Sequence, residues 1–204
     1  DEYWDNAVSI AFDDSGEPWL AWSDFDYSTY SYQIKTAHGI PFENVSVAVP
    51  QDGYQVSPDL AFTDRMWLVW QDWEAQGGRI MLKSISGGSF SCQLSEIGSW
   101  ATSPSISEGP SGLLHAVWVQ TDDSGSRVIW TCGDQGGFSA PVAITEQQFP
   151  VCHSPGLGLV DGILVLSWQE DGIASCIMAS TWNGSEWSQP VQVEEHSGHL
   201  SSPR

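Results

Sequence analysis

A mostly apolar segment of seven residues recurs four times along the chain. The four copies are Pro18–Asp24, Met66–Asp72, Leu114–Gln120 and Leu164–Glu170. The inner tryptophans of these segments are separated by 48, 48 and 50 residues, and they are Trp22, Trp70, Trp118 and Trp168. Similarity of a chain to itself at a period of about 40 to 50 residues is typical of propellers and repeat arrays.

Two further landmarks recur in the same phase. A late aromatic residue follows each segment, at steps of 48, 48 and 49 residues: Phe42, Phe90, Phe138 and Trp187. A Ser-Pro pair opens the later repeats at Ser57-Pro58, Ser103-Pro104, Ser154-Pro155 and Ser202-Pro203, and Ala7-Val8 takes this position in the first repeat. The landmarks predict one domain over residues 1–204, with blades at about 5–56, 57–102, 103–153 and 154–201.

Each repeat is predicted to fold into four short strands. In the second repeat we expect them at 59–62, 66–71, 79–84 and roughly 91–95, separated by turn residues. Side chains alternate across a strand, so Leu68 and Trp70 lie on one face and their apolar neighbours on the other. Because both faces are apolar, both must be buried, and radial stacking of sheets achieves this. The sequence therefore predicts an all-β β-propeller with about four blades, each a four-stranded antiparallel sheet.

The last residues allow three interpretations of the ring. Residues 202–204 resemble the start of a fifth unit. Either they pair beside the first blade and close a four-bladed ring, or the chain is part of a larger ring. In the third interpretation, several chains complete one ring together. An unclosed stack exposes apolar sheet faces, so self-association through the end blades is one expectation.

The charge of the chain narrows the class of partner. There are 26 Asp and Glu residues against six Lys and Arg, which gives a formal net charge of -20. This excludes nucleic acid, because phosphate binding needs basic patches. Carbohydrates, basic proteins and cations stay open, and solubility alone would also explain the charge. No apolar run approaches the length of a membrane span.

Several local features of the sequence indicate in which cellular or extracellular compartment the protein is located. Asn44 and Asn183 begin the acceptor pattern for N-glycosylation, which favours a secreted or cell-surface protein. The sequence lacks an initial Met and a signal peptide, as expected of a processed or excised chain. The cysteines form no Cys-x-x-Cys motif, so no zinc site is predicted, and both disulfides and free thiols stay open. They are Cys92, Cys132, Cys152 and Cys176.

The repeats resemble those of sialidase-like propellers, the group with BNR or Asp-box repeats and their degenerate relatives. The segments that carry the resemblance are Ser154-Pro155, Leu166–Gln169 and Asn183–Val191. The Asp-box pattern Ser-x-Asp-x-Gly-x-x-Trp is met in part: Asp14, Gly16 and Trp19 fit, whereas Phe12 replaces the serine. That group includes sialidases and other glycosidases, lectins of related architecture and non-catalytic propellers, so the fold alone assigns no activity.

The arginines argue against a sialidase. The resemblance implies an arginine cluster that grips the substrate carboxylate, a tyrosine nucleophile with a carboxylate partner, and an aspartate acid. Arg79 and Arg127 both lie nine residues after an inner tryptophan, so they are equivalent repeat positions rather than a cluster, and Arg65 and Arg204 add no cluster. Other glycosidases need only two carboxylates, and 26 acids make such pairs uninformative. The sequence therefore predicts a protein that is not an enzyme.

Acidic residues follow the second strand of every repeat. They are Asp24 and Asp26, Asp72 and Glu74, Asp122 and Asp123, and Glu170 and Asp171. Equivalent loops of successive blades emerge on the same face, so we expect these acids to form an arc on one rim. Such an arc suits sugar hydroxyls or calcium, the one cofactor left open. The alternative is that the acids only cap strand ends.

Aromatic residues accompany the acidic loops. Tyr27 and Trp73 lie in the loops themselves. Trp100 shares a repeat position with Tyr54, on a connection that a meander places on the same rim. Binding of ligand and packing between blades are both consistent with these positions.

Three functional hypotheses result. The first is a non-enzymatic extracellular β-propeller that binds carbohydrate or protein through its loop face. The second is a structural or assembly protein whose end blades dock other subunits. The third is a fragment of a sialidase-like glycoside hydrolase, which requires catalytic residues from elsewhere.

Overall fold

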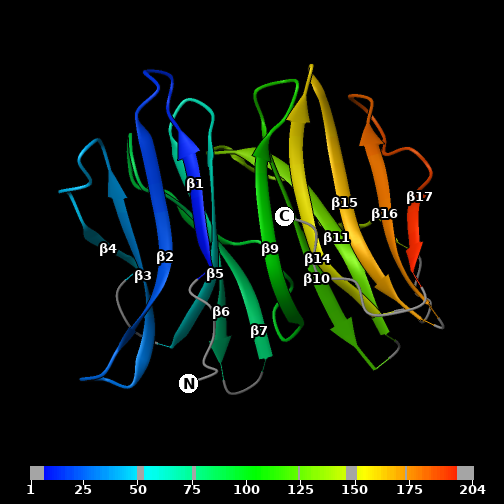
Figure 1. Cartoon of the computed structure of the whole chain (residues 1–204), viewed down its shortest axis with the longest axis horizontal. Helices are drawn as coiled ribbons and strands as arrows, with labels where there is room; N and C mark the ends of the chain where they lie inside the picture. Colours follow the sequence, from blue (N-terminus) through cyan, green and yellow to red (C-terminus); the bar gives the residue numbers. More distant parts are fainter. Residues whose placement is uncertain are drawn as a thin grey trace. The chain divides into compact units, whose positions relative to one another are not determined.

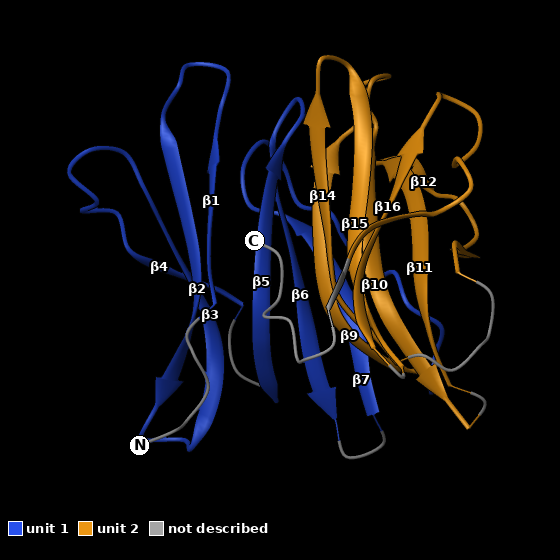
Figure 2. Cartoon of the chain, turned by 45° about the vertical axis from the view of Figure 1, so that its right-hand side comes forward, with its two compact units in different colours: residues 1–98 blue, residues 99–204 orange. Residues whose placement is uncertain are grey.

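The regular structure of this protein consists of β-strands. The computed structural model describes residues 7–49, 53–74, 77–123, 125–145, 151–172 and 174–196. Within these ranges no helix occurs that could cross a membrane. The strands form two compact units, residues 1–98 and 99–204, each made of two antiparallel sheets (Figure 2). The prediction of an all-β propeller with about four antiparallel blades is confirmed. The expected fifth unit at 202–204 lies outside the described residues.

The first unit contains two four-stranded meanders (Figure 1). The strands of the first sheet are β1 (Val8–Phe12), β2 (Pro18–Asp26), β3 (Ser31–His38) and β4 (Ser46–Val49). The strands of the second sheet are β5 (Tyr54–Phe62), β6 (Met66–Glu74), β7 (Gly77–Ser84) and β8 (Ser91–Gln93). Because sequential strands pair antiparallel, successive hairpins lie at opposite ends of each sheet.

The second unit repeats this arrangement with one variation. The strands of its first sheet are β9 (Trp100–Glu108), β10 (Leu114–Asp122), β11 (Gly125–Asp134), β12 (Gly137–Phe138) and β13 (Val142–Ala143). The outer position is divided, because β12 and β13 both pair with β11. The strands of the other sheet are β14 (Val151–Val160), β15 (Ile163–Asp171), β16 (Ser175–Trp182) and β17 (Val191–His196).

The repeated segment supplies the core of each unit. In the first unit Leu68 and Trp70 pack in one apolar cluster with Ala21 of the neighbouring sheet. In the second unit Leu166 and Trp168 pack in a cluster whose other members include Val117, Val119 and Val128. Full burial of an aliphatic side chain of this size stabilises a fold by roughly 1.5–3 kcal/mol. The sheets of each unit are therefore held together mainly by apolar contact.

The Ser-Pro pairs mark bulges inside the first strands rather than the openings of the blades. Three first strands begin three residues before their serine, at Tyr54, Trp100 and Val151. Ser57, Ser103 and Ser154 adopt positive φ angles of 51°, 54° and 46°. The pairing register shifts in the same part of each strand. A bulge lets the strand continue through a proline, which has no N–H to donate to the ladder.

The first strands of neighbouring sheets lie side by side. In the first unit the Ser9 hydroxyl donates to Asp59 Oδ1 at 2.7 Å and accepts from the Leu60 N–H at 3.0 Å. In the second unit the Ser105 hydroxyl accepts from the Leu157 N–H at 3.3 Å. These equivalent bonds tie the sheets together along β1 and β5 and along β9 and β14. They fix which edges of the sheets come together.

The turn between β1 and β2 is built on Asp13, one residue before the aspartate that the Asp-box pattern selects. Asp13 Oδ1 accepts hydrogen bonds from the Ser15 N–H, the Ser15 hydroxyl and the Glu17 N–H. The Trp19 indole donates to Oδ2 at 3.4 Å. The bonds from Ser15 and from the Glu17 backbone hold the pKa of Asp13 below its ordinary value. Asp13 therefore does the structural work that the sequence assigned to Asp14.

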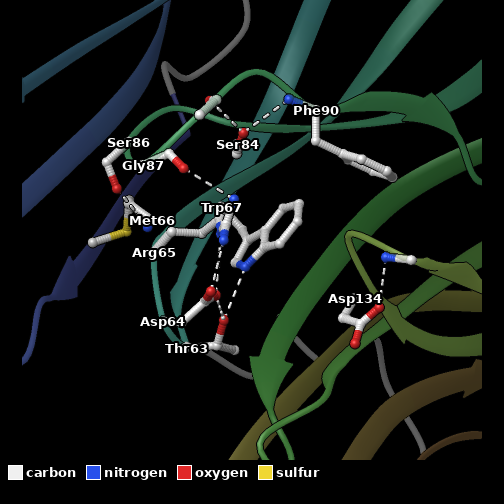
Figure 3. A network of polar contacts seen from close by, with 12 residues as sticks. Thr63, Asp64, Arg65, Met66, Trp67, Ser84, Ser86, Gly87, Phe90 and Asp134 are labelled. Carbon is white, nitrogen blue, oxygen red and sulfur yellow. Dashed lines mark hydrogen bonds and ion pairs between the residues drawn. The ribbon is translucent and has the colours of Figure 1, made fainter.

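A polar network joins the turn between β5 and β6 to the turn after β7 in the second sheet (Figure 3). The Arg65 guanidinium donates to both carboxylate oxygens of Asp64, from Nε at 3.1 Å and from Nη2 at 2.7 Å. It also donates to the Gly87 carbonyl and lies 5.8 Å from the centroid of the Trp67 ring. The Trp67 indole in turn donates to the Thr63 hydroxyl. Arg65 is thus a structural residue of its own sheet.

The four cysteines are free thiols. Burial raises the pKa of Cys92 and Cys132, and it raises the pKa of Cys152 to about 11. Because the thiolate is the reactive form, the raised pKa lowers the reactivity of these three side chains at neutral pH.

His115 is a packing residue of the second unit. It is 1% exposed, and its Nδ1 accepts a hydrogen bond from the Trp130 indole at 3.1 Å. Burial lowers the pKa of His115 to about 4. Gly109 lies against the other side of the ring, where an added Cβ would stand 2.3 Å from Nε2. The imidazole is therefore enclosed in its neutral form.

Gly109→Ala is expected to lower the free energy of unfolding by about 1–3 kcal/mol, because the new methyl group overlaps the enclosed imidazole. Gly158→Ala is the matched control, since nothing lies within 4 Å of the point where its new Cβ would stand and its φ is not positive. Urea unfolding of both variants gives the comparison. Equal stability of the two variants would show that the His115 ring can move aside.

His115→Gln is expected to flatten the pH dependence of stability on the acid side. The unfolded histidine binds a proton below about pH 6.5, whereas the folded one resists protonation until about pH 4. Stability is therefore lost as the pH falls through this window, at about 1 kcal/mol per pH unit. The measurement is the unfolding free energy at pH 7 and pH 5. An undiminished pH dependence in the glutamine variant would contradict the assignment.

Candidate functional site

The predicted acidic residues lie on strand ends rather than in long loops. The second strands end at Asp26, Glu74, Asp122 and Asp171, so most of these acids belong to the sheets. Only Tyr27 and Asp123 lie in the hairpin turns themselves. The expectation of acidic loops is corrected in this respect. The side chains are held by strand pairing, which positions them more rigidly than a loop would.

In the first unit, the hairpin between β2 and β3 lies near the hairpin between β6 and β7, and these hairpin ends of the sheets are called the hairpin edges. Tyr54 opens β5 and pairs in register with Trp73, which places it beside the hairpin between β6 and β7. The Tyr54 ring lies 6.1 Å from the ring of Tyr32, at the hairpin end of β3. The predicted proximity of the Tyr54 position to the acidic edge therefore holds within this unit.

An aromatic cluster covers this edge. The Phe25 ring contacts Tyr27 at 5.0 Å, Tyr30 at 6.3 Å and Tyr32 at 5.0 Å between centroids. Tyr27, Tyr30 and Tyr54 are 79%, 72% and 51% exposed. Sequence reasoning found Tyr27 as a site residue but not Phe25 or Tyr32. The signal that could have found them is the pairing of Phe25 with Tyr32 across the two strands of this aromatic-rich hairpin.

Asp24 lies at the hairpin end of β2, and one of its carboxylate oxygens contacts both a lysine and a glutamine amide. Lys35 Nζ lies 2.8 Å and Gln33 Nε2 lies 3.0 Å from its Oδ2. Partial burial acts to raise the pKa of Asp24, but the hydrogen bonds from Lys35 and Gln33 and the charge of Lys35 outweigh it. The pKa of Asp24 therefore lies below its ordinary value. Asp24 is ionised under neutral and mildly acidic conditions.

The acids of the second sheet share one arginine. Arg79 donates to Asp72 Oδ2 from Nε at 3.1 Å and from Nη2 at 2.7 Å. The same Nη2 lies 2.7 Å from Glu74 Oε1. Asp72 is buried and Glu74 is exposed. Arg79 therefore holds both carboxylates in place across the pair of strands β6 and β7.

Asp26 has a local structural role. Its Oδ1 accepts hydrogen bonds from the Ser28 N–H at 2.8 Å and from the Ser28 hydroxyl at 2.7 Å. This is the Asx-type turn that the strand-cap alternative predicts. Asp26 therefore shapes the hairpin that presents Tyr27 and Tyr30.

The second unit has its own pair of hairpin edges. Trp100 pairs with Thr121 at the end of β10 and is 45% exposed. The Cys152 N–H donates to the Ser126 hydroxyl at 2.6 Å, which joins the start of β14 to the start of β11. The hairpin between β10 and β11 therefore lies beside that between β15 and β16.

The acids of the second unit are also engaged locally. Asp122 forms an ion pair with Arg127. Glu170 Oε1 accepts from the Trp168 indole at 2.8 Å, and Asp171 Oδ1 accepts from the Gln169 amide at 2.8 Å. The strand-cap alternative thus describes these contacts well. An arc that joins the acids of all four sheets stays a prediction.

The hairpin edges lack a cluster of metal ligands among the described residues, and their cations are already paired with carboxylates. Among the described residues, no group of three or more His, Cys, Asp or Glu side chains could hold a metal. Three of the described cations, Lys35, Arg79 and Arg127, pair with acids of their own sheet at these edges. Arg204 lies outside the described residues. The edges therefore present carboxylates, amides and aromatic rings.

Comparisons with known proteins give fold relatives only. No family model and no curated protein sequence matches the chain. Among solved structures, the Penicillium chrysogenum α-L-arabinanase complexed with arabinobiose has a TM-score of 0.71 at 10% identity, over 97% of this chain and 69% of that one. The α-L-arabinofuranosidase from Lactobacillus brevis has a TM-score of 0.63 at 13% identity, over 95% and 72%.

A sialidase is also similar. The Trypanosoma rangeli sialidase in complex with the inhibitor DANA has a TM-score of 0.62 at 11% identity, over 92% of this chain and 37% of that one. The resemblance to sialidase-like propellers therefore holds at the level of fold. At such identities the likeness shows the fold alone.

These comparisons overturn the prediction of a non-enzymatic binding module. The similar structures are mostly glycoside hydrolases, which favours the third hypothesis, a hydrolase fragment, over the first. The prediction failed because a missing arginine cluster argues only against substrates that carry a carboxylate. Arabinobiose carries none, so the same fold can act on a neutral sugar without such a cluster. The chain is thus an all-β propeller similar to arabinan-acting hydrolases.

Proposed function

We propose that this chain is part of a glycoside hydrolase that acts on a neutral, arabinose-containing oligosaccharide or polysaccharide. The observation that carries the proposal is the likeness to arabinanases and arabinofuranosidases over nearly the whole chain, together with carboxylates fixed at the hairpin edges. An extracellular location follows from the proposal, because polymeric substrates of this class lie outside cells.

The charges at the edges favour a neutral substrate over a sialylated one. Lys35, Arg79 and Arg127 are each engaged by an acid of their own sheet. A carboxylated sugar would have to displace one of these ion pairs and would meet a chain of net charge -20. Exposed tyrosines beside the acids suit the apolar faces of sugar rings, with hydroxyls left for polar partners.

We assign Asp24 the role of the ionised carboxylate in hydrolysis. Glycoside hydrolysis uses one carboxylate as base or nucleophile and a second carboxyl group as proton donor. The lowered pKa of Asp24 suits the first role. Asp24 and the aromatic cluster around Phe25 lie at the same hairpin end of β2, with the Asp24 and Phe25 side chains on opposite faces of the strand. Arg79 keeps Asp72 in position on the neighbouring sheet.

Asp24→Asn is expected to lower kcat on arabinan or 4-nitrophenyl α-L-arabinofuranoside by about 100-fold or more, as for loss of a catalytic base. Asp14→Asn is the matched control, because Asp14 is exposed in the turn at the opposite end of the same sheet. Its activity should stay within about twofold. Absence of hydrolysis by the unmodified chain would refute the proposal, and full activity of the Asp24 variant would refute the role of Asp24.

Lys35→Met is expected to move the acid limb of the pH–rate profile to higher pH. Burial alone raises the pKa of Asp24, and Lys35 is the main group that opposes it. Without Lys35 the carboxylate takes up its proton at a higher pH, so activity is lost earlier as the pH falls. Lys83→Met serves as control, because Lys83 donates to the Ala48 carbonyl rather than to a carboxylate. An unchanged limb in the Lys35 variant would contradict the assignment.

A further inference from the structure

A groove of about 770 Å³ lies between the two sheets of the second unit. Its volume falls in the range of roughly 300–1,000 Å³ that is usual for ligand sites. The lining comes from β11, the segment around β13, the ends of β14 and β15, and the hairpin between β16 and β17. Glu170 lies near one end of the sheet, and Trp182 lies at the opposite end, where it pairs with Leu164. None of the roles described above uses this groove as a whole.

One wall of the groove is a cluster of three tryptophans. The centroids of Trp130 and Trp182 are 4.6 Å apart, those of Trp182 and Trp187 are 5.6 Å apart, and those of Trp130 and Trp187 are 6.0 Å apart. The rings are thus in contact, which leaves no room for a cation between them. This excludes an aromatic cage of the kind that binds quaternary ammonium groups. A ligand ring can instead stack on the outer surface of the cluster.

The polar groups of the groove carry no positive charge. Ser185, Gln189 and Glu186 come from the hairpin after β16, and Glu170 comes from the end of β15. The described lining residues include no Lys, Arg or His, so an anionic ligand would be repelled. The Trp187 indole N–H is buried and has no hydrogen-bond partner among the described residues. A buried donor without a partner destabilises the fold, and a ligand hydroxyl that reaches it would relieve this cost.

We propose that this groove binds a stretch of neutral oligosaccharide, separately from the acidic hairpin edges. Stacking of a sugar ring on Trp182 and Trp187 and hydrogen bonds from its hydroxyls to Glu186 and Gln189 account for both chemical features of the groove. This inference rests on the proposed carbohydrate function. In a hydrolase the groove would hold a distant part of the polymer and raise its local concentration without taking part in bond cleavage.

The test is titration of the Asp24→Asn protein with arabinotriose by calorimetry, alone and with groove substitutions added. Trp182→Leu removes the stacking surface, and Ser185→Trp fills the groove from an exposed position. Each is expected to weaken the affinity of this site about tenfold or more. Thr181→Trp is the matched control, because Thr181 is exposed on β16 and does not line the groove, and it should bind like the parent. If Trp182→Leu fails to fold, the affinity of Ser185→Trp for arabinotriose is the test of the groove.

Hydrolysis separates this inference from the proposed function. With Asp24 intact, the groove substitutions should raise KM for arabinan several-fold and leave kcat on the aryl arabinofuranoside within about twofold. Unchanged arabinotriose affinity in Ser185→Trp, with hydrolysis intact, would overturn the groove and leave the proposed function standing. Groove-dependent binding by a chain that hydrolyses neither substrate would overturn the proposed function and leave the groove. No binding of arabinotriose at all would overturn the groove.

Discussion

The structure depends on the need to bury a strand that is apolar on both faces. Leu68 and Trp70 enter the cluster shared by the sheets of the first unit, and Leu166 and Trp168 enter the corresponding cluster of the second. A sheet with two apolar faces cannot be stable alone in water, so it must stack on a neighbour. Stacking in turn brings the first strands side by side, and the hairpin edges of neighbouring sheets then meet.

Bulges in the first strands determine which side chains lie at those hairpin edges. The positive φ of Ser57 and Ser103 creates bulges that let β5 and β9 run past a proline. The strands therefore extend to Tyr54 and Trp100, which stand beside the acidic strand ends. Serine is not favoured at positive φ, and each such residue costs about 1 kcal/mol or more. That this conformation recurs in three sheets indicates that neighbouring contacts, such as those made by Ser9 and Ser105, hold it in place.

The architecture could be predicted because it is determined by a periodic pattern of apolar residues, and this pattern can be read directly from the sequence. It could not predict details that rest on single contacts. The pattern selected Asp14, whereas the turn is built on Asp13, because two adjacent aspartates are equivalent until the Ser15 and Glu17 N–H groups are placed. The Ser-Pro pairs looked like strand openings for a related reason, since a bulge is a register effect between two strands.

The candidate site stays a prediction, and its local contacts could not be derived from the sequence. Asp24 and Asp72 were expected in loops after the second strands, whereas they belong to those strands. Their ion pairs depend on the register, which places Arg79 opposite Asp72 and Lys35 two residues beyond the partner of Asp24. The aromatic cluster around Phe25 lies within one hairpin, where Phe25 pairs with Tyr32 across β2 and β3, so it depends on the register of these two strands. The functional class was wrong because the lack of an arginine cluster argues only against a charged sugar, and carboxylate pairs in a chain with 26 acids do not reveal a site for a neutral one.

The scarcity of cations links the charge of the chain to the ligand that it can take. Lys35, Arg65, Arg79 and Arg127 all bind acids of their own sheets, so they stabilise strands and are not free to bind a ligand. The uncompensated acids leave a negative field that extends about a Debye length, roughly 8 Å at physiological ionic strength. Such a field repels anionic polymers before contact and does not act on neutral sugars. Recognition must then come from short-range stacking and hydrogen bonds. These are what the tyrosines of the first unit and the tryptophans of the second can provide.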